Sequence, residues 1–466
     1  MKVCSLYGAG FYYIPGTDIC MKVGGYVRFQ QSYGASTSIT AGPVGTSNGF
    51  NREHTPEYQY RARAIATFDT RQQTAYGTLR TYLILGFTQD SVANTANPGA
   101  DANGTTLYAT RAFIQIAGFT FGKATSFFDF VSTAAVAYNA GHTYSPDTGD
   151  LGHTVAAYTA QFGNGMSATL SVEQDRRRGT NYLGSAIAGG GGAQIANADL
   201  GGTAALQDIV ANLRVDQAWG SAQIAAAVRP MSASYYGAGN QSSALVEWNG
   251  HPGEEYGWAV TAGVRLNAPM IGPGDYFQIA GVYAEGATRY ASNTPTTALL
   301  SQGRTVAQVI HDDGGFSGTA AAPGLFERTT AWSIFASYEH FWTPSLRTSV
   351  YGSYLNISRP DNLNTAMCAS GLFNNGAAAA GGRAAGCDLD SSQWNIGTRS
   401  QWNITKDLYV GVDFIYHKVN TATFNAAGTA NLSAGALPGK AASATYTTGD
   451  IDAFVTTWRI HRDIVP

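Results

Sequence analysis

The sequence predicts an all-β fold, a 16-stranded antiparallel transmembrane β-barrel, and three observations lead to this prediction. Only 13% of the 466 residues are charged, about half of the roughly 25% that is usual in soluble domains. Sixteen segments alternate between apolar and polar residues with a period of two, and their apolar row is nearly free of charge. The connections between these segments alternate between short and long. This asymmetry is typical of a barrel with short periplasmic turns and long extracellular loops.

The composition excludes several other classes of protein. The chain contains 56 glycines, 12% aromatic residues and an ordinary hydrophobic fraction of 44%. No segment approaches the roughly 18 consecutive apolar residues of a membrane-spanning helix, which excludes an α-helical membrane protein. A net charge of −3 leaves no positive surplus for phosphates, so nucleic acid is not an expected partner.

Each predicted strand has one apolar and one polar face. In the first of them, Val27 and Phe29 lie on one row and Arg28 lies on the other. The predicted strands are 22–30, 59–68, 78–88, 107–118, 121–130, 153–163, 166–175, 208–218, 221–230, 257–267, 275–286, 328–341, 346–358, 391–403, 407–418 and 450–461. Because an arginine or lysine facing lipid at the bilayer midplane costs ~2–4 kcal/mol, the charge-poor row is expected to face lipid. A soluble β-sandwich or adhesin also alternates in this way and remains an alternative.

The placement of aromatic residues favours the membrane barrel over the sandwich. The short connections fall at positions such as 163–165, 219–220 and 342–345, and aromatic side chains gather beside them. These residues are Phe119, Phe162, Trp219, Trp342, Trp402 and Trp458. Aromatic belts at the membrane interface have this distribution. An even number of strands also brings both chain ends to the periplasmic side.

The polar row of the first four predicted strands carries a group of arginines. They are Arg28, Arg61, Arg63, Arg80 and Arg111. Guanidinium groups are permanently charged, so a strip of them facing water creates a fixed electric field. We expect a basic ladder on one sector of the inner wall. The alternative is that these arginines are solvated and paired with carboxylates of the wall.

An acidic counterpart to the ladder is expected on the connection after the fifth strand, residues 131–152. This connection carries Asp147 and Asp150 and follows Asp129. If the loop folds into the barrel, its acids face the arginines and form a narrow constriction with a transverse field. Several aromatic residues also lie on the polar row without an evident ladder: Tyr26, Tyr82, Phe113, Phe335, Tyr351 and Tyr409.

The four cysteines form two sequence-local pairs that predict disulfides. Cys4 lies near Cys20 and Cys368 lies near Cys387, and neither pair has the spacing of a zinc knuckle. Three connectivities are possible, and the local one is favoured over the other two and over four free thiols. Disulfides indicate an oxidising compartment. The first residues lack the basic stretch and apolar core of a signal peptide, so we expect a mature, exported form.

The sequence predicts no catalytic residues, no cofactor site and no metal site. The eight histidines show no nucleophile and base spacing with a serine. A cation bound by His311, Asp312 and Asp313, or by Asp388 and Asp390, is an alternative to solvation of these loop residues.

Several motifs along the whole chain resemble the mature porins of the alphaproteobacterial (rhizobial-type) outer-membrane porin family. The motifs are Cys4–Cys20, Lys22–Arg28, Arg61–Arg63, Tyr76–Arg80, Arg111–Gln115, Phe121–Phe130, Tyr158–Gly165 and Trp458–Arg459. The resemblance implies a homotrimer of barrels in the bacterial outer membrane, with an inward-folded third loop. It also implies passive passage of small hydrophilic solutes and ions, with outer-membrane lipid and lipopolysaccharide as surroundings.

The predicted organisation is an N-terminal disulfide-bracketed periplasmic segment, residues 1–21, followed by the transmembrane barrel, residues 22–466. A general diffusion channel is the expected function. A substrate-specific outer-membrane channel is the alternative, and it would place aromatic stripes or binding clusters along the lumen.

Overall fold

The structure is a computed structural model of the chain. It describes residues 4–34, 58–91, 103–138, 143–147, 152–176, 178–182, 207–232, 251–292, 298–319, 322–369, 386–431 and 444–464. In these parts of the chain, no helix is long and apolar enough to cross a membrane.

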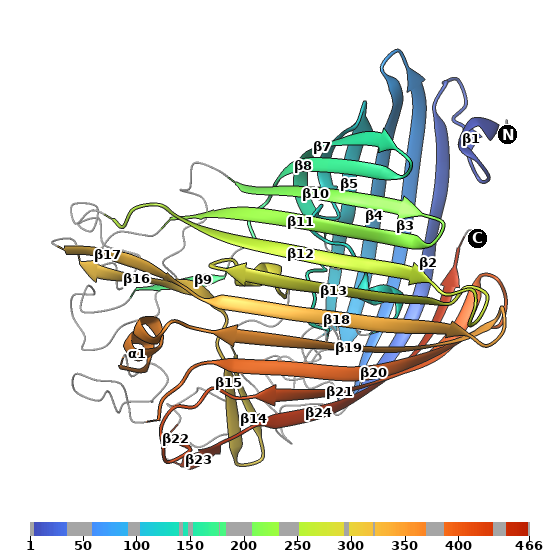
Figure 1. The fold of residues 1–466 in the computed structure, drawn as a ribbon. Coiled ribbons are helices and arrows are strands. Elements are labelled where there is room, and N and C mark those ends of the chain that lie inside the picture. The colour runs from blue at the N-terminus through green and yellow to red at the C-terminus, as the bar shows by residue number, and fades with distance from the viewer. Residues whose placement is uncertain are drawn as a thin grey trace.

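Sixteen antiparallel strands of the described chain close into one barrel (Figure 1). Each strand is hydrogen-bonded to the next along the chain, and the last, β24, pairs with the first, β2. The strands are β2 (Cys20–Tyr33), β3 (Tyr58–Thr74), β4 (Gly77–Ser91), β5 (Asn103–Ile116), β6 (Phe119–Ala124), β7 (His153–Gly163), β8 (Met166–Glu173), β10 (Asp208–Gln217), β11 (Gly220–Met231), β12 (Glu255–Asn267), β13 (Tyr276–Glu285), β18 (Thr330–Phe341), β19 (Leu346–Ser358), β20 (Ser391–Asn403), β21 (Leu408–Asn420) and β24 (Ile451–Asp463). The predicted all-β, 16-stranded antiparallel barrel is therefore confirmed.

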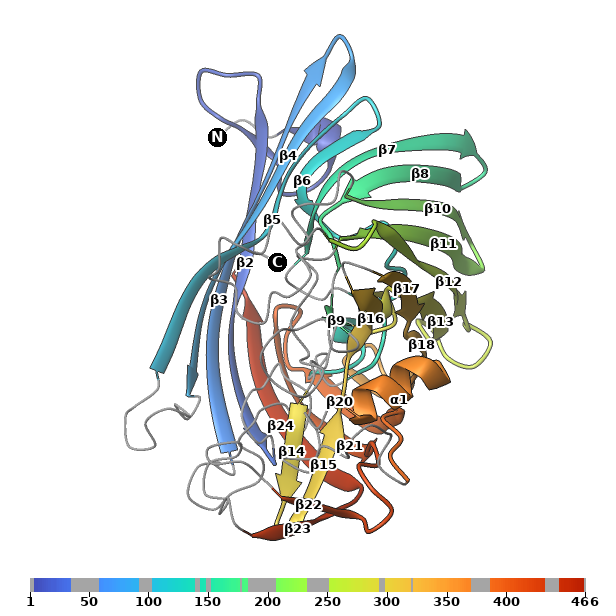
Figure 2. The same ribbon diagram turned by 90° about the vertical axis from the view of Figure 1, so that its left-hand side faces the viewer.

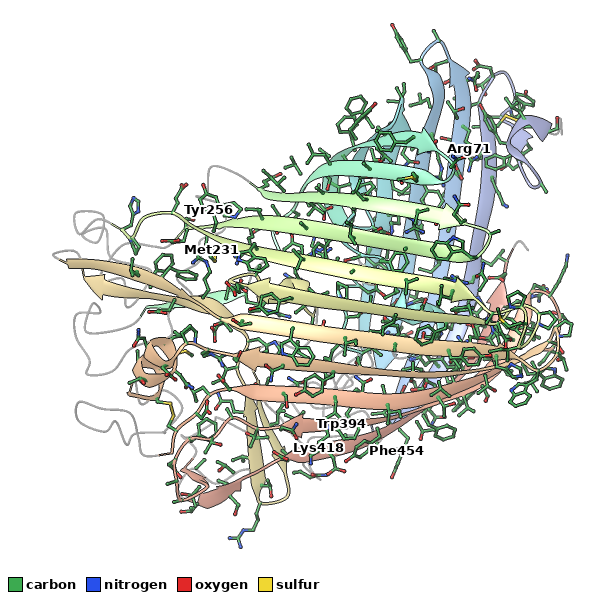
Figure 3. All side chains as sticks on the ribbon, viewed as in Figure 1. Arg71, Met231, Tyr256, Trp394, Lys418 and Phe454 are labelled. Atoms are coloured by element: carbon green, nitrogen blue, oxygen red, sulfur yellow. A yellow bond between two sulfur atoms is a disulfide. The ribbon has the colours of Figure 1, made fainter. Side chains whose placement is uncertain are left out.

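The two faces of the barrel wall follow the predicted alternation. In β11, for example, Ile224 and Val228 are exposed on the outer face, whereas Arg229 is buried on the inner one. Phe454 and Trp394 also project from the outer face (Figure 3). The six aromatic residues predicted beside the short turns are all exposed, by 41% to 65% of their surface. The wall thus has an apolar outside and a polar inside, as a barrel in lipid requires.

One predicted strand is wrong at its end. The fifth strand was expected to cover 121–130, but β6 ends at Ala124 and the following residues leave the wall. Phe128 is fully buried inside the barrel and packs edge-on against Tyr290, with 4.7 Å between the ring centroids. The apolar residues after Ala124 are therefore buried by an inward loop and do not continue the wall.

The short connections and both chain ends lie at one end of the barrel (Figure 1). There the 3₁₀ helix η1 (Ser5–Tyr7) precedes β1 (Tyr12–Tyr13), which pairs with the start of β2. The Cys4–Cys20 and Cys368–Cys387 disulfides are both present, which confirms the predicted pairing. The first barrel strand begins at Cys20, two residues before the expected boundary. The division into a 1–21 segment and a 22–466 barrel stays a prediction.

The long connections at the other end fold into small structures of their own (Figure 2). They contain η2 (Thr133–Ala135), β9 (Gly179–Tyr182), η6 (Thr288–Tyr290), β14 (Ala298–Gln302), β15 (Thr305–Val309), β16 (Asp312–Thr319), β17 (Ala322–Arg328), α1 (Asp361–Ala369), β22 (Thr429–Asn431) and β23 (Thr445–Thr448). One sheet has the order β14-β15-β23-β22 and joins the sixth loop, 286–329, to the eighth loop, 421–450. Another has the order β17-β16-β9 and joins the sixth loop to the fourth, 174–207.

Candidate functional site

The third loop, residues 125–152, lies inside the barrel in its described part. The backbone N–H of Tyr144 donates to Ser353 Oγ at 2.8 Å, and its hydroxyl donates to Gln393 Oε1 at 2.8 Å. Ser349 Oγ donates to the carbonyl oxygen of Val136 at 2.5 Å. The wall residues belong to β19 and β20, so the loop covers the inner face of these strands. It narrows the lumen from one side.

Two glycines of the wall allow the third loop to approach closely. A Cβ atom at Gly411 would overlap the hydroxyl of Tyr138, and one at Gly263 would overlap the ring of Phe130. Both glycines lie on the inner face, in β21 and β12 respectively. A larger side chain at either position would push the loop into the lumen.

The register of β24, β2 and β3 places inner residues of these three strands opposite one another in two rows. The first row is His461, Arg28 and Arg63, and the second is Arg459, Gln30 and Arg61. We call these six residues the arginine wall. Because alternate residues of a strand face the same side, both rows lie on the inner face of the barrel. The structure thus brings together Arg28, Arg61 and Arg63 of the predicted ladder.

Two arginines of the arginine wall donate hydrogen bonds to neutral oxygen atoms. Arg63 Nε donates to Thr88 Oγ1 at 3.0 Å. Arg459 donates to Gln30 Oε1 at 2.7 Å and to the carbonyl oxygen of Tyr138 at 2.8 Å. A neutral acceptor orients a guanidinium group without cancelling its charge. The second of these bonds also joins the arginine wall to the third loop.

The other two predicted arginines lie apart from this wall. Arg80 is opposite Arg71 in register, near a short turn, and both guanidinium groups bind the carboxylate of Asp69, at 3.0 and 2.9 Å. Arg111 donates to Thr125 Oγ1 at 3.0 Å, at the root of the third loop. The five predicted arginines therefore do not form one ladder. Arg80 is paired with a carboxylate of the wall, as the alternative interpretation expected, and Arg111 binds the start of the third loop.

The predicted acids of the third loop have different surroundings. Asp129 forms an ion pair with Arg176 at 2.8 Å, and the two side chains are 3% and 1% exposed. It therefore serves as a buried link between the third and fourth loops, and it is not retained as a lumen charge. Asp147 accepts hydrogen bonds from the N–H and hydroxyl of Thr133, at 2.9 and 3.1 Å. Asp150 lies outside the described residues.

The sixth loop is fixed to the barrel wall and to the seventh loop by two neighbouring carboxylates, each paired with an arginine. Asp312 binds Arg359 of the seventh loop at 2.6 Å, and Asp313 binds Arg229 of β11. Asp313 also accepts a hydrogen bond from the backbone N–H of Arg178, in the fourth loop, at 2.7 Å. We call Asp312, Asp313, Arg229 and Arg359 the loop clamp.

Burial shifts the pKa values of Asp312, in the loop clamp, and of Arg178, whose N–H binds the clamp. It raises the pKa of Asp312, although Arg359 and the hydroxyl of Thr329 act in the opposite direction. Burial, together with the nearby Arg289 guanidinium, lowers the pKa of Arg178 to about 10. Asp312 and Asp313 each have a structural role, because each forms a buried ion pair with an arginine. In the described parts of the chain, no group of three or more His, Cys, Asp or Glu side chains is placed to hold a metal ion.

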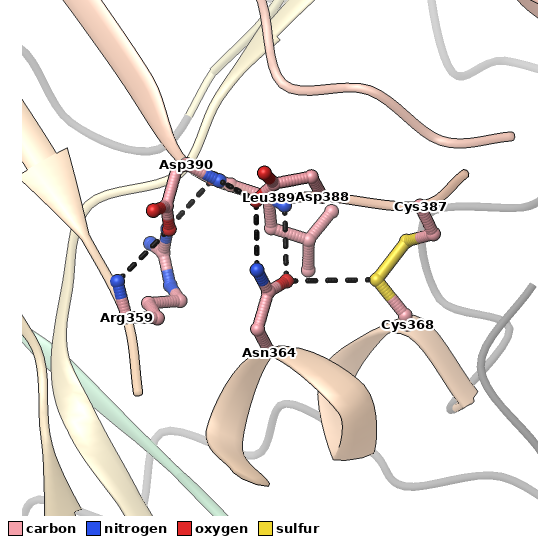
Figure 4. Close-up of a disulfide and its surroundings, with 7 residues drawn as sticks. All are labelled: Arg359, Asn364, Cys368, Cys387, Asp388, Leu389 and Asp390. Atoms are coloured by element: carbon pink, nitrogen blue, oxygen red, sulfur yellow. Dashed lines mark hydrogen bonds between the residues drawn. A yellow bond between two sulfur atoms is a disulfide. The ribbon is translucent and has the colours of Figure 1, made fainter. Parts of the chain in front are cut away.

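The seventh loop, residues 359–390, is held by a disulfide and by Arg359 (Figure 4). Arg359 donates to the carbonyl oxygen of Leu389 at 2.7 Å, and its backbone N–H donates to Asp390 Oδ1 at 2.9 Å. Asn364 Nδ2 donates to Asp388 Oδ1 at 2.7 Å. Asp388 and Asp390 therefore stabilise the loop that follows α1.

Sequence reasoning missed two features of the lumen. Arg459 lies on the polar row of the last strand, and its position opposite Gln30 emerges only when the barrel closes between β24 and β2. The inward aromatic residues were expected to form no ladder, but Tyr26 and Tyr409 both contact the ring of His461, which lies between them. The alternation of residues can be recognised within one segment, but the register, which pairs residues of two strands, cannot.

An apolar outer face, a polar lumen and an inward loop together define a β-barrel channel of the outer membrane. The chain belongs to the Porin subfamily, whose family model matches residues 1–447. It is a bacterial outer-membrane protein.

Curated relatives agree with the family assignment, and a solved structure agrees with the fold. The chain is 29% identical to porin Omp2b of Brucella melitensis over 239 residues, which are 47% of this chain and 54% of that protein. It is 30% identical to the outer membrane protein y4fJ of Sinorhizobium fredii over 129 residues, 28% of this chain and 34% of that protein. The chain thus spans about half or less of the length of these curated relatives. The outer membrane channel DcaP of Acinetobacter baumannii has a similar fold, with a TM-score of 0.55 at 12% identity over 97% of this chain and 99% of that one.

Proposed function

We propose that the protein is a general diffusion porin, a water-filled channel for passive passage of small hydrophilic solutes and ions. We further propose that it is a homotrimer, with the outer row in contact with outer-membrane lipid and lipopolysaccharide. Its action needs no catalytic residue and no cofactor, because a channel only lowers the barrier to diffusion.

The arginine wall carries this proposal. Arg28, Arg61, Arg63 and Arg459 come from three adjacent strands and share one side of the lumen. The bond from Arg459 to Tyr138 supports a position of this group near the third loop. A solute that passes the loop therefore passes a positively charged surface, which favours anions over cations of the same size. Asp147 and Asp150 of the loop are proposed as its acidic counterpart.

Conductance of the purified protein in a planar lipid bilayer tests the proposal. Stepwise current increases in KCl are expected, with a reversal potential that shows an anion preference in a salt gradient. Liposomes that contain the protein should swell in neutral sugars at rates that fall with sugar size. Absence of conductance from protein that shows heat-modifiable migration on detergent gels would contradict the proposal. A detergent-resistant trimer band that dissociates on heating is expected on the same gels.

A substrate-specific channel is the second candidate, and the aromatic contacts at His461 favour it. Saturation of the flux of one solute class, in place of a linear rise with concentration, would distinguish it from a general porin.

A further inference from the structure

Three aromatic rings from adjacent strands form a continuous strip on the inner face of the barrel. The ring of His461 in β24 lies 4.4 Å from that of Tyr26 in β2, and 4.6 Å from that of Tyr409 in β21, measured between centroids. The planes of His461 and Tyr409 differ by 14°, so these two rings are stacked. We call Tyr26, His461 and Tyr409 the ring strip.

The inner position of the ring strip follows from the strand register. His461 is opposite Arg28 and Tyr409, and it is two residues from Arg459 on the same strand. Residues two apart on a strand face the same side, so the strip shares the inner face with the arginine wall. Tyr26 and Tyr409 are both half-buried, and His461 between them is 9% exposed.

Two guanidinium groups lie near the ring strip, one at Tyr26 and one beyond Tyr138 of the third loop. The central carbon of the Arg28 guanidinium is 5.3 Å from the centroid of the Tyr26 ring. At the other end, the ring of Tyr138 lies 6.3 Å from that of Tyr409, and the guanidinium of Arg459 is 4.0 Å from Tyr138. Asp463 Oδ1 is 3.1 Å from Nε2 of His461 and is the acid beside the strip. The aromatic strip thus has two guanidinium groups beside it on the inner face.

We propose that the ring strip and its flanking arginines form a binding subsite for anions that carry a flat aromatic ring, with benzoate as the simplest probe. The ring of the solute packs against the strip, and its carboxylate accepts hydrogen bonds from Arg28 or Arg459. Neutral sugars lack the charge, and simple inorganic anions lack the ring. This proposal rests on the proposed function, because the solute must enter an open channel to reach the strip.

Single-channel current in KCl with added benzoate tests the proposal. The matched probe is cyclohexanecarboxylate, which has the same charge and ring size but no aromatic face. Benzoate should reduce or interrupt the wild-type current at concentrations several-fold lower than cyclohexanecarboxylate does. In the double variant Tyr26→Leu/Tyr409→Leu, the benzoate effect should weaken roughly fivefold, the size expected for lost aromatic contacts. The effect of cyclohexanecarboxylate should change little.

Two control variants separate stacking from other changes in the lumen. Tyr409→Phe keeps the ring and should keep the benzoate effect. Tyr82→Leu removes another inner tyrosine, which contacts Phe113 at 5.4 Å and belongs to no part of the strip, and it should also keep the effect. Heat-modifiable migration and KCl conductance show that each variant is folded.

Three results would overturn the proposal. They are equal responses of wild-type protein to the two carboxylates, an unchanged benzoate response in the double variant, and equal loss of the response in Tyr82→Leu. Absence of KCl conductance in the wild-type protein would instead contradict the proposed channel function. The two failures are therefore distinguishable.

Discussion

Charged side chains have different binding partners in two regions of the inner surface. On the wall that the third loop covers, Arg399 of β20 pairs with Glu339 of β18, and both side chains are buried. The hydroxyl of Tyr351 donates to Asp413 beside them, and this carboxylate also accepts a hydrogen bond from the N–H of Tyr138. On the arginine wall, by contrast, Arg459 and Arg63 bind neutral amide, carbonyl and hydroxyl oxygens.

The two regions differ in the acceptors that hold their charged groups. Where a loop excludes water, a charge without an ion-pair or hydrogen-bond partner would cost several kcal/mol. On the arginine wall, the neutral oxygens of Gln30 and of Tyr138 in the third loop orient the guanidinium of Arg459 without cancelling its charge. One alternating pattern therefore provides both a structural ion-pair network and a group of neighbouring guanidinium groups on the inner wall.

Removal of an ion pair from the loop clamp should have the largest effect on the protein. In Asp313→Asn, the guanidinium of Arg229 loses its ion pair, whose side chains are 0% and 1% exposed in the wild-type protein. Loss of one partner of a buried pair costs about 3–5 kcal/mol. The sixth loop should detach from β11, and proteases should cleave residues 286–329 faster. Single-channel current should become larger and noisier.

An exposed ion pair supplies the control for the loop clamp. Asp450→Asn removes the pair between Asp450 and Lys418, whose side chains are 46% and 36% exposed. Pairs of this kind contribute about 0–1 kcal/mol, so protease resistance and current should change little. Equal protease resistance of Asp313→Asn and wild-type protein would show that the clamp does not hold the loop.

Removal of charge from the arginine wall should have the next largest effect. In Arg61→Ala/Arg63→Ala, the reversal potential in a KCl gradient should shift towards cations, and the conductance should rise as the lumen widens. The shift should be greatest near 0.01 M salt, where the Debye length is about 30 Å. It should fade near 1 M, where that length is about 3 Å.

Arg80→Ala is the control for the arginine wall. Its guanidinium shares the carboxylate of Asp69 with Arg71, so its removal should shift the reversal potential less. An unchanged potential and conductance in the Arg61 and Arg63 double variant would remove the arginine wall as the selectivity element.

The strands could be predicted from the sequence because each residue of the wall faces either lipid or the lumen. That constraint acts on every second position and is therefore visible within one segment. The disulfides were also predictable, since each joins cysteines only 16 or 19 residues apart.

The loop clamp could not be predicted, because its partners are far apart in the sequence. Asp312 and Arg359 are separated by 47 residues, and Asp313 and Arg229 by 84. No local pattern indicates such a pairing, so Asp312 and Asp313 resembled solvated or cation-binding loop residues. The same limit applies to Asp129, whose partner Arg176 is 47 residues away and converts an expected lumen charge into a buried link.

Asp275, at the short-turn end of the barrel, is a third case, because hydrogen bonds hold its carboxylate without an arginine. Asp275 precedes β13 and accepts hydrogen bonds from the Tyr338 hydroxyl at 2.5 Å, His340 Nδ1 at 2.7 Å and the Phe341 N–H at 2.8 Å. Burial acts to raise its pKa, but these hydrogen bonds outweigh it and hold the pKa of Asp275 below the ordinary value. The ionised form is therefore the one that stabilises the turn.

The smallest effect is expected for Asp275→Asn, and it should appear as a pH-dependent loss of stability relative to the wild-type protein. A lowered folded pKa means that the stabilisation is complete well above the unfolded pKa of about 3.9 and disappears as the pH falls through the folded value. At pH 7, the variant should unfold at a lower guanidinium concentration than the wild-type protein, and the gap should narrow below about pH 4. Asp407→Asn changes another short turn, where Thr405 Oγ1 donates to the carboxylate at 2.6 Å. Because Asp407 is more exposed than Asp275, its gap at pH 7 should be smaller. A gap for Asp275→Asn that stays constant between pH 7 and pH 3 would show that the charge of this carboxylate does not stabilise the turn.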